Sequence, residues 1–266
     1  MDVTGKIIVV TGAAHGIGAA LCRRFAAENA AHVVVSDIDQ EAALTLAAEI
    51  NGTAIACDVA SETAVQNLVK QTEAACGPID VFFSNAGITV KGGLETPNDQ
   101  WQTMWDVNVM SRLYAARAVV PGMLERGSGY LIHTASGAGL LTEIGSASYS
   151  ATKHADVALA EWLSVTYGRQ GIAVSTVCPL GVKTDFLDEE DPVHQFLHMN
   201  AVTVEDVADA VIQGMKEEQF LILPHADVAE YITMKADNHD RFIRGFQRLK
   251  QKLTKKLNKK KNNDAA

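Results

Sequence analysis

The apolar positions of this chain form short β-branched runs separated by longer stretches of helical periodicity. The short runs are continuously apolar rather than strictly alternating, which is typical of parallel strands covered on both faces. They lie at residues 6–11, 32–36, 53–57, 80–84, 130–134, 173–178 and 220–223, and helical stretches lie near residues 17–29, 39–49, 62–76, 98–125, 149–169 and 204–217. This alternation predicts an α/β fold, a doubly wound parallel sheet of about seven strands with helices on both faces.

The alternation continues without a linker or repeat, so we expect one domain over residues 1–225 and a helical C-terminal extension over residues 226–266. In the extension, apolar residues recur at steps of three and four, as a one-sided stripe: Phe242, Phe246, Leu249, Leu253 and Leu257. A basic amphipathic helix of this kind can lie on an anionic membrane surface. The alternative is a stripe that packs on the body or a partner subunit, with solvated lysines and a frayed end. The second is favoured, because few bulky anchors accompany the charge.

Composition narrows the class of protein. The chain has 266 residues, of which 47% are hydrophobic and 21% charged, as in ordinary globular proteins. Residues 241–266 hold ten of the 23 basic residues and one of the 32 acidic residues, a net charge of +9. The remaining 13 basic and 31 acidic residues leave a body of net charge −18, which argues against nucleic acid as a partner.

Several features favour a cytoplasmic protein. No stretch approaches the roughly 18 consecutive apolar residues of a membrane span, and the start lacks the pattern of a secretory signal. The four cysteines are scattered without metal-ligand spacing, which indicates reduced thiols and no metal site. His194 and His198, four residues apart, have no third ligand nearby.

A glycine-spaced turn follows the first predicted strand. Gly12, Gly16 and Gly18 lie where a helix begins, and helix N-termini offer free N–H groups and partial positive charge to phosphate. Asp37 ends the second strand about 20 residues later, where a carboxylate can accept hydrogen bonds from both ribose hydroxyls of a dinucleotide. The same carboxylate repels a 2′-phosphate, and Asp39 adds to this repulsion. The pattern favours NAD over NADP.

A phenol and an ammonium lie four residues apart in the middle of the chain. Tyr149 and Lys153 leave the same face of a predicted helix. Bringing a tyrosine pKa from near 10 towards 7 takes about 4 kcal/mol. An ammonium about 5 Å away supplies about 3 kcal/mol at an effective dielectric of about 20. The pair therefore predicts a base for hydride transfer from an alcohol, with Lys153 doing most of the pKa shift.

These motifs together resemble the short-chain dehydrogenase/reductase family, in its shorter single-domain branch, over roughly residues 5–225. The resemblance rests on the glycine turn from Thr11 to Gly18, on the Asn85-Ala86-Gly87 segment, and on single residues that match family positions. These are Asp58, Asn108, Ser136, Tyr149 and Lys153. It implies a Rossmann fold and an NAD(P)-dependent oxidoreductase.

The resemblance also implies roles for individual residues. Ser136, Tyr149, Lys153 and Asn108 would be catalytic, with Ser136 on the substrate oxygen and Asn108 holding a water of a proton relay. The cofactor would contact Gly12, His15, Gly16, Ile17, Gly18, Asp37, Asp58, Val59, Asn85, Ala86, Gly87, Tyr149, Lys153, Pro179, Gly181, Val182 and Thr184. In the family a glycine usually follows the proline of the segment at 179–184 directly, whereas Leu180 intervenes here. The departure leaves the local backbone geometry open.

Apolar side chains surround the expected substrate position. Phe186, Leu187, Phe196, Leu197 and Met199 lie in the predicted lid, and Leu140, Leu141 and Ile144 lie opposite. They predict a lipophilic secondary alcohol or ketone, steroid-like, aryl or aliphatic, as substrate. The alternative function is a non-catalytic NAD(H)-binding regulatory protein. We expect a homodimer formed by the long helices near 98–125 and 149–169, and a tetramer is the alternative.

Overall fold

A computed structural model of the chain describes residues 1–184 and 200–264, and it leaves the side chains from residue 256 onward outside the description. The predicted lid residues and both lid histidines therefore lie outside the described residues. Seven parallel strands form one sheet in the order β3-β2-β1-β4-β5-β6-β7. They are β1 (Ile7–Thr11), β2 (His32–Asp37), β3 (Thr53–Ala56), β4 (Val81–Ser84), β5 (Gly129–Thr134), β6 (Ile172–Val177) and β7 (Leu221–Ile222). The predicted fold is confirmed, and strand ends differ by one or two residues.

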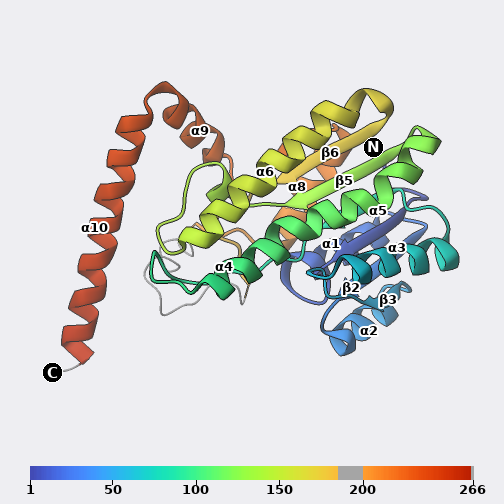
Figure 1. The fold of residues 1–266 in the computed structure, drawn as a ribbon, viewed down its shortest axis with the longest axis horizontal. Coiled ribbons are helices and arrows are strands. Elements are labelled where there is room, and N and C mark those ends of the chain that lie inside the picture. Colours follow the sequence, from blue (N-terminus) through green and yellow to red (C-terminus); the bar gives the residue numbers. More distant parts are fainter. Residues whose placement is uncertain (185–199, 265–266) are drawn as a thin grey trace.

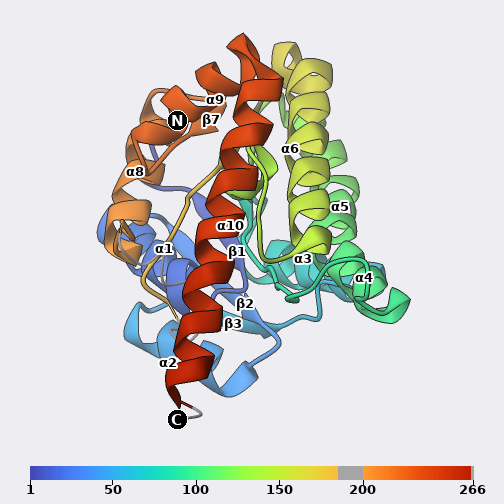
Figure 2. The same cartoon turned by 90° about the vertical axis from the view of Figure 1, so that its left-hand side faces the viewer.

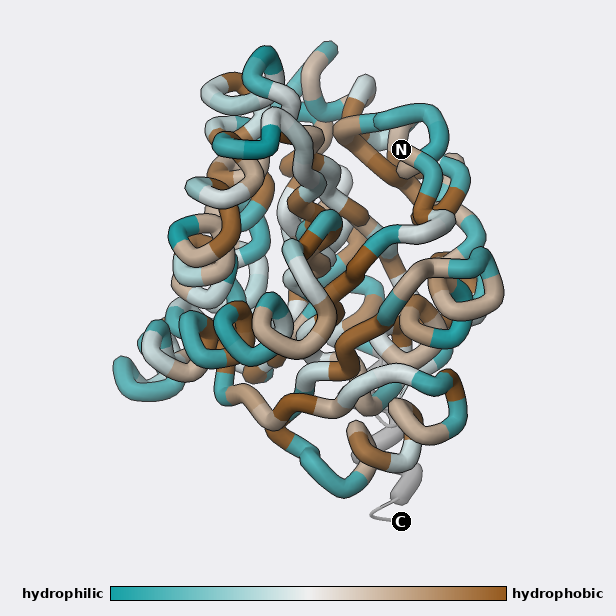
Figure 3. Tube along the Cα trace, turned by 90° about the vertical axis from the view of Figure 1, so that its right-hand side faces the viewer, coloured by the Kyte–Doolittle hydropathy of each residue, from teal (hydrophilic) through white to brown (hydrophobic). Residues whose placement is uncertain are grey.

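Helices cover both faces of the sheet, and two apolar cores separate them from it (Figures 1 and 2). One core joins the sheet to α1 (Gly16–Ala27), α2 (Gln40–Glu49) and α8 (Val204–Lys216). The other joins it to α3 (Glu62–Cys76), α5 (Ser111–Arg126) and α6 (Ala147–Tyr167). Figure 3 shows the hydrophobic segments concentrated along the central strands. Burial on both faces explains why the strands read as continuous apolar runs.

The helix predicted near residues 98–125 consists of three parts. α4 (Asn98–Trp105) leads into a π-helical turn, η1 (Asp106–Met110), and then into α5. A π-turn inserts an extra residue into a helix and is frequently found at functional sites. It carries Asn108, whose side chain is fully buried.

The C-terminal extension consists of α9 (Asp227–Asp237) and α10 (His239–Asp264). The basic segment expected to fray is helical as far as Asp264. α10 runs beside the end of the molecule where α4 and α6 begin (Figure 1). α9 is anchored to the body by Lys235, whose Nζ donates to the carbonyls of Leu140 and Leu141 at 2.6 and 3.0 Å. No helix in the described part of the chain is long and apolar enough to cross a bilayer.

Candidate active site

A cleft of about 860 Å³ lies at the carboxyl ends of the central strands, where doubly wound sheets bind ligands. Nearly all of the predicted site residues line it: Gly12, His15, Gly16, Ile17, Asp37, Asp58, Val59, Asn85, Ala86, Gly87, Ser136, Tyr149, Lys153, Pro179, Val182 and Thr184. Gly18, Asn108 and Gly181 do not line it. The topology thus brings residues from seven segments of the chain into one cavity.

The glycine turn depends on close contacts within the chain itself. Gly12 has a φ of +60°, and a Cβ there would lie 2.6 Å from Ala86 Cα. A Cβ on Gly18 would lie 2.1 Å from the Gly12 carbonyl oxygen. The sequence predicts one purpose for the glycines, approach to a ligand, whereas Gly12 and Gly18 are also required for the turn to pack against the segment after β4 and against the start of α1.

The N-terminus of α1 differs from that of its neighbours. Its N-cap residue, His15, makes no side-chain capping bond, whereas Asp39 caps α2, Ser61 caps α3 and Ser146 caps α6. Uncapped N–H groups at a helix start are available to an anion. The end of this helix that borders the cleft therefore fits a phosphate.

Asp37 lies at the carboxyl end of β2 with both oxygens facing backbone donors. Oδ2 accepts the N–H of Ala14 at 2.9 Å, and Oδ1 accepts the N–H of Asp39 at 3.0 Å. An ionised carboxylate has about four acceptor positions, so two remain for hydroxyl groups. Asp58 is exposed at the end of β3, and its Oδ1 accepts the Ala60 N–H.

Asn85 joins the ends of three strands at the middle of the cleft. Its Nδ2 donates to the carbonyls of Thr11 and Gly12 at 3.1 and 2.9 Å. Its Oδ1 accepts the hydroxyl of Thr134 at 3.0 Å. These bonds hold β1, β4 and β5 in register where the cleft opens.

Tyr149 lies in the first turn of α6 and is 9% exposed. The N-cap Ser146 fixes this turn, since its Oγ accepts the Tyr149 N–H at 3.1 Å. A hydrogen bond with the Ser136 side chain reaches the phenol. Burial, and after it the Glu143 carboxylate, raises the pKa of Tyr149 well above its usual value. The expected lowering of this pKa by Lys153 is therefore not achieved by the groups of the protein alone.

Lys153 is buried one turn further along α6. Its Nζ donates to the Thr134 carbonyl at 2.8 Å and lies 5.5 Å from the centre of the Tyr149 ring. Burial, followed by repulsion from Arg112, lowers the pKa of Lys153 to about 7, although Asp156 opposes this change. An uncharged lysine could not stabilise a tyrosinate. The charges that surround Lys153 therefore decide whether it can lower the pKa of Tyr149.

Asn108 occupies the layer behind the cleft. Its Oδ1 accepts the Ile88 N–H at 3.0 Å, and its Nδ2 donates to the Ile88 carbonyl and to Thr152 Oγ1 at 3.0 and 3.2 Å. The side chain thus ties the segment after β4 to α6. The predicted water-holding role stays a prediction, and the structure adds this tie.

The segment after β6 shows how the unusual Leu180 is accommodated. Gly137 faces it, and a Cβ on Gly137 would lie 2.5 Å from Leu180 Cδ2. The Leu180 N–H donates to Nδ1 of the buried His225, just before α9, at 3.2 Å. Gly181 follows, and it faces a second cleft rather than the first.

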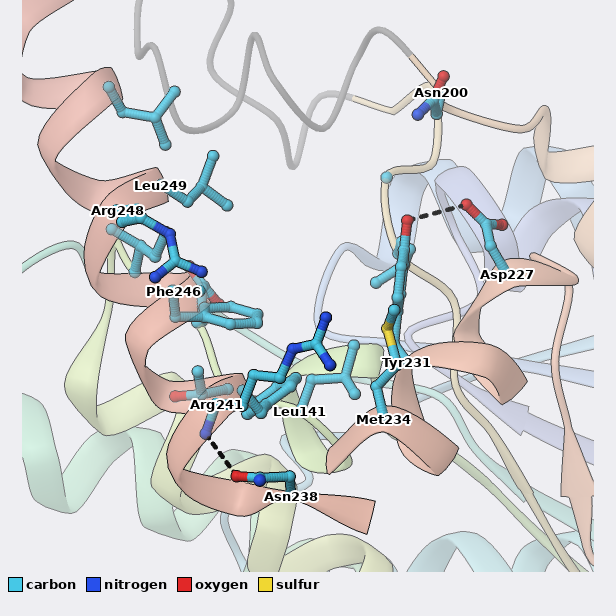
Figure 4. Close-up of a pocket in the computed structure, with 18 of the residues that line it drawn as sticks. Leu141, Asn200, Asp227, Tyr231, Met234, Asn238, Arg241, Phe246, Arg248 and Leu249 are labelled. Carbon is cyan, nitrogen blue, oxygen red and sulfur yellow. Dashed lines mark hydrogen bonds between the residues drawn. The ribbon is translucent and has the colours of Figure 1, made fainter. Parts of the chain in front are cut away.

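The second cleft, of about 590 Å³, lies between the body and the C-terminal extension. Figure 4 shows Phe246 and Leu249 of α10 on one side and Tyr231 and Met234 of α9 on the other. Three residues line both clefts, Thr142, Glu143 and Leu180, so the two cavities adjoin beside Tyr149. Leu141 and Ile144, predicted to contact substrate, line the second cleft, whereas Leu140 does not.

Sequence reasoning missed several residues of this site. Glu143 and the C-terminal residues Tyr231, Met234 and Arg241 border the clefts without belonging to any motif. Arg112, His133 and Asp156 are buried beside Lys153. A signal for these three was present, because each is an ionisable residue within an otherwise apolar core segment.

Comparison with known proteins gives a consistent result. Residues 6–195 match the short chain dehydrogenase family. The chain is 35% identical over 236 residues to 1-deoxy-11-beta-hydroxypentalenate dehydrogenase of Streptomyces exfoliatus, covering 85% of this chain and 86% of that one. It is 35% identical over 189 residues to meso-2,3-butanediol dehydrogenase of Serratia marcescens, covering 70% and 74%.

A solved structure shares the fold at close to full length. It is a short chain dehydrogenase/reductase from Burkholderia phymatum in complex with NAD, with a TM-score of 0.83, 26% identity, and coverage of 90% of this chain and 96% of that one. A 7α-hydroxysteroid dehydrogenase complexed with NADH and 7-oxo glycochenodeoxycholic acid matches with a TM-score of 0.76 and 25% identity, covering 83% and 93%.

Proposed function

This chain belongs to the short-chain dehydrogenase family of oxidoreductases, and we propose that it interconverts a secondary alcohol and a ketone with NAD as cofactor. The observation that carries the proposal is the meeting of Ser136, Tyr149 and Lys153 at one end of the cleft that contains the glycine turn. The same cleft has the volume and the phosphate-accepting helix start that a dinucleotide needs.

The preference for NAD rests on charge at the adenosine end. Asp37 keeps acceptor capacity for the ribose hydroxyls and repels a 2′-phosphate. Arg23 also lines the cleft, but its Nε and Nη2 are paired with the two oxygens of Glu49 at 2.7 and 2.9 Å. This cation is therefore already neutralised by a carboxylate.

NAD bound in the cleft beside Ser136, Tyr149 and Lys153 would supply the hydride chemistry of the reaction. Tyr149 takes the proton of the alcohol, or returns it to the ketone oxygen. Ser136 holds the same oxygen by a hydrogen bond, a role that its contact with the phenol of Tyr149 supports. Protonated Lys153 stabilises the phenolate form of Tyr149 by its charge.

A lipophilic substrate fits the second cleft. A molecule lying among Leu141, Tyr231, Met234 and Phe246 would reach Tyr149 across the shared residues. Similar proteins include one named for 1-deoxy-11-beta-hydroxypentalenate and one bound to 7-oxo glycochenodeoxycholic acid. We therefore place steroid-like and other large apolar alcohols first among the candidates, ahead of small aliphatic ones.

The outer surface of α6 supports a homodimer. Trp162 and Val165, three residues apart, are 58% and 86% exposed. Aromatic and branched side chains that the single chain leaves exposed on a long helix are typical of a surface that a partner subunit covers. We propose a dimer through α5 and α6, and light scattering of the wild type and of Val165→Glu tests it, because a charge on this surface would favour the monomer.

The decisive experiment is a dehydrogenase screen with steroid, aryl and aliphatic secondary alcohols, with NAD and NADP in parallel, followed by the absorbance of the reduced cofactor. Tyr149→Phe should lose about 10²-fold or more in turnover, the usual contribution of a general acid or base. Unchanged turnover in this variant would refute the mechanism. Tight NADH binding without turnover on any alcohol or ketone would favour the regulatory alternative.

A further inference from the structure

Four ionisable side chains meet in the core directly behind the proposed proton donor. Arg112 from α5, His133 from β5, and Lys153 and Asp156 from α6 are all nearly or fully buried. Buried ionisable groups are costly and must be paired. The proposed reaction accounts for Lys153 but not for the other three.

Asp156 is the centre of the group. Its Oδ1 lies 2.8 Å from His133 Nδ1, and since an ionised carboxylate can only accept, that nitrogen is the donor. Its Oδ2 lies 3.3 Å from Arg112 Nε and 4.0 Å from Lys153 Nζ. Among the described residues, Oδ2 accepts no aligned hydrogen bond. One carboxylate oxygen therefore faces two cations.

Arg112 is held firmly in this position. Its Nη1 donates to the Val107 carbonyl at 2.7 Å and to Ser111 Oγ at 2.8 Å. Its Nη2 reaches the Thr134 carbonyl at 3.5 Å, the same oxygen that accepts from Lys153 Nζ at 2.8 Å. The guanidinium and the ammonium thus share an acceptor and repel each other. Because arginine stays charged in proteins, the lysine is the group that can give up its proton.

In the part of the chain that the structure describes, few charged groups act on Lys153. Arg112 on α5 and Asp156 on α6 are the charged groups that act on it most strongly. His133 on β5 and Tyr149 on α6 are hydrogen-bonding groups, and burial raises the pKa of Cys178, after β6, to about 11, so this thiol stays neutral. Burial alone would raise the pKa of Asp156, but Arg112 and then His133 hold it below its usual value. Asp156 is therefore ionised throughout the working range.

We infer that Asp156 is a positioning residue whose charge offsets that of Arg112 and keeps Lys153 protonated for its work on Tyr149. This inference rests on the proposed function. Its consequence is that the Arg112–Asp156 pair sets the upper pH limit of alcohol oxidation, because the reaction needs Lys153 charged. Burial and Arg112 favour loss of the lysine proton, and Asp156 favours its retention.

The test compares three full-length variants, Asp156→Asn, Arg112→Met and the double variant, by the pH dependence of kcat. Asp156→Asn should move the falling limb at high pH down by about one pH unit or more, the usual effect of an opposite charge at this distance. Arg112→Met should move it up, and the double variant should fall between. Asp80→Asn is the matched control, since Asp80 pairs with Lys6 at the amino ends of β1 and β4, the opposite end of these strands from the cleft. It should leave the limb in place.

A second measurement does not depend on turnover. NMR of protein labelled with ¹³C at the lysine ε position, with Lys153→Arg to assign the signal, follows the titration of Lys153 directly. The midpoint of this titration should shift to lower pH in Asp156→Asn and to higher pH in Arg112→Met. Shifts in one common direction, or no shift, would overturn the inference. If Asp156→Asn does not fold, the upward shift in Arg112→Met and its reduction in the double variant remain decisive. A wild type without turnover on any alcohol would refute the proposed function, and the NMR titration would still decide the role of Asp156.

Discussion

The two ends of the main cleft differ in the kind of polar group that lines them. At the end that contains the glycine turn, the polar groups are backbone N–H groups and carboxylates that remain partly exposed, such as Asp37 and Asp58. At the end that contains Tyr149, they are side chains removed from water and tied to one another. Backbone geometry sets the polar groups at the first end, whereas burial and mutual charge govern those at the second.

This difference predicts at which end of the cleft the removal of a charge has the larger energetic effect. A carboxylate in contact with solvent is screened and keeps ordinary energetics. A carboxylate in the core interacts with its neighbours at a much lower effective dielectric. Substitutions of equal chemistry should therefore have unequal consequences at the two ends, and the following predictions measure that inequality.

The largest difference should appear in stability. Asp156→Asn leaves Arg112 buried without its counter-charge, which costs about 3–5 kcal/mol of unfolding free energy. Asp37→Asn weakens two hydrogen bonds to half-exposed backbone groups and should cost at most about 1–2 kcal/mol. Urea denaturation of both variants measures the two values. Equal losses would mean that the two ends do not differ as described.

The same pair has a pH dependence with a definite sign. The pKa of Asp156 is lowered by Arg112 and His133 against the effect of burial, so its charge stabilises the fold above the unfolded-state value of 3.8. That contribution is lost as the pH falls through the lower folded-state value. Wild-type stability should therefore decline on acidification more steeply than that of Asp156→Asn.

A smaller effect is expected in cofactor choice. Asp37→Ser removes both the repulsion of a 2′-phosphate and a charged acceptor for the ribose, a change of about 1.5–3 kcal/mol in the preference for NAD. The ratio of kcat/KM for NAD and NADP should fall about tenfold or more. Asp80→Asn is the control, because it removes an equal charge at the amino ends of β1 and β4, away from the cleft. Turnover with NADP as efficient as with NAD in the wild type would show that Asp37 does not discriminate.

The next effect concerns the rising limb of the pH dependence of kcat for alcohol oxidation. After burial, Glu143 is the main cause that raises the pKa of Tyr149, so Glu143→Gln should move this limb to lower pH. Asp58→Asn removes an equal charge at the other end of the cleft and should alter cofactor affinity without moving the limb. The pH dependence of kcat for the two variants distinguishes them, and a limb that moves in both would contradict the separation.

The smallest effect should come from an exposed ion pair. Arg23 and Glu49 are about half exposed, so Glu49→Gln should change stability by about 0.2–1 kcal/mol. This value is the counterpart of Asp156→Asn, since both variants break an arginine–carboxylate contact. A loss for Glu49→Gln as large as that for Asp156→Asn would show that exposure does not govern the cost.

The contrast also explains what the sequence allowed us to predict. The strands and the glycine turn depend on local patterns, so their positions were predicted within one or two residues. The π-turn at Asp106–Met110 was not, because helical periodicity does not register one inserted residue. The contact between Arg112 and Asp156 joins residues 44 positions apart on two helices, and no spacing rule reports it. Leu180 broke the family pattern, and its explanation, His225, lies 45 residues further on.

The second cleft has walls of two origins. Leu141, Glu143 and Leu180 come from loops of the body, whereas Tyr231, Met234 and Phe246 belong to the C-terminal helices and contribute nothing to the sheet. Substitutions on α9 and α10 can therefore change the shape of this cleft without touching Tyr149 and Lys153 on α6. Under the proposed function, related proteins can diverge in the substrate that they accept while the reaction stays the same, since separate segments of the chain carry the two traits.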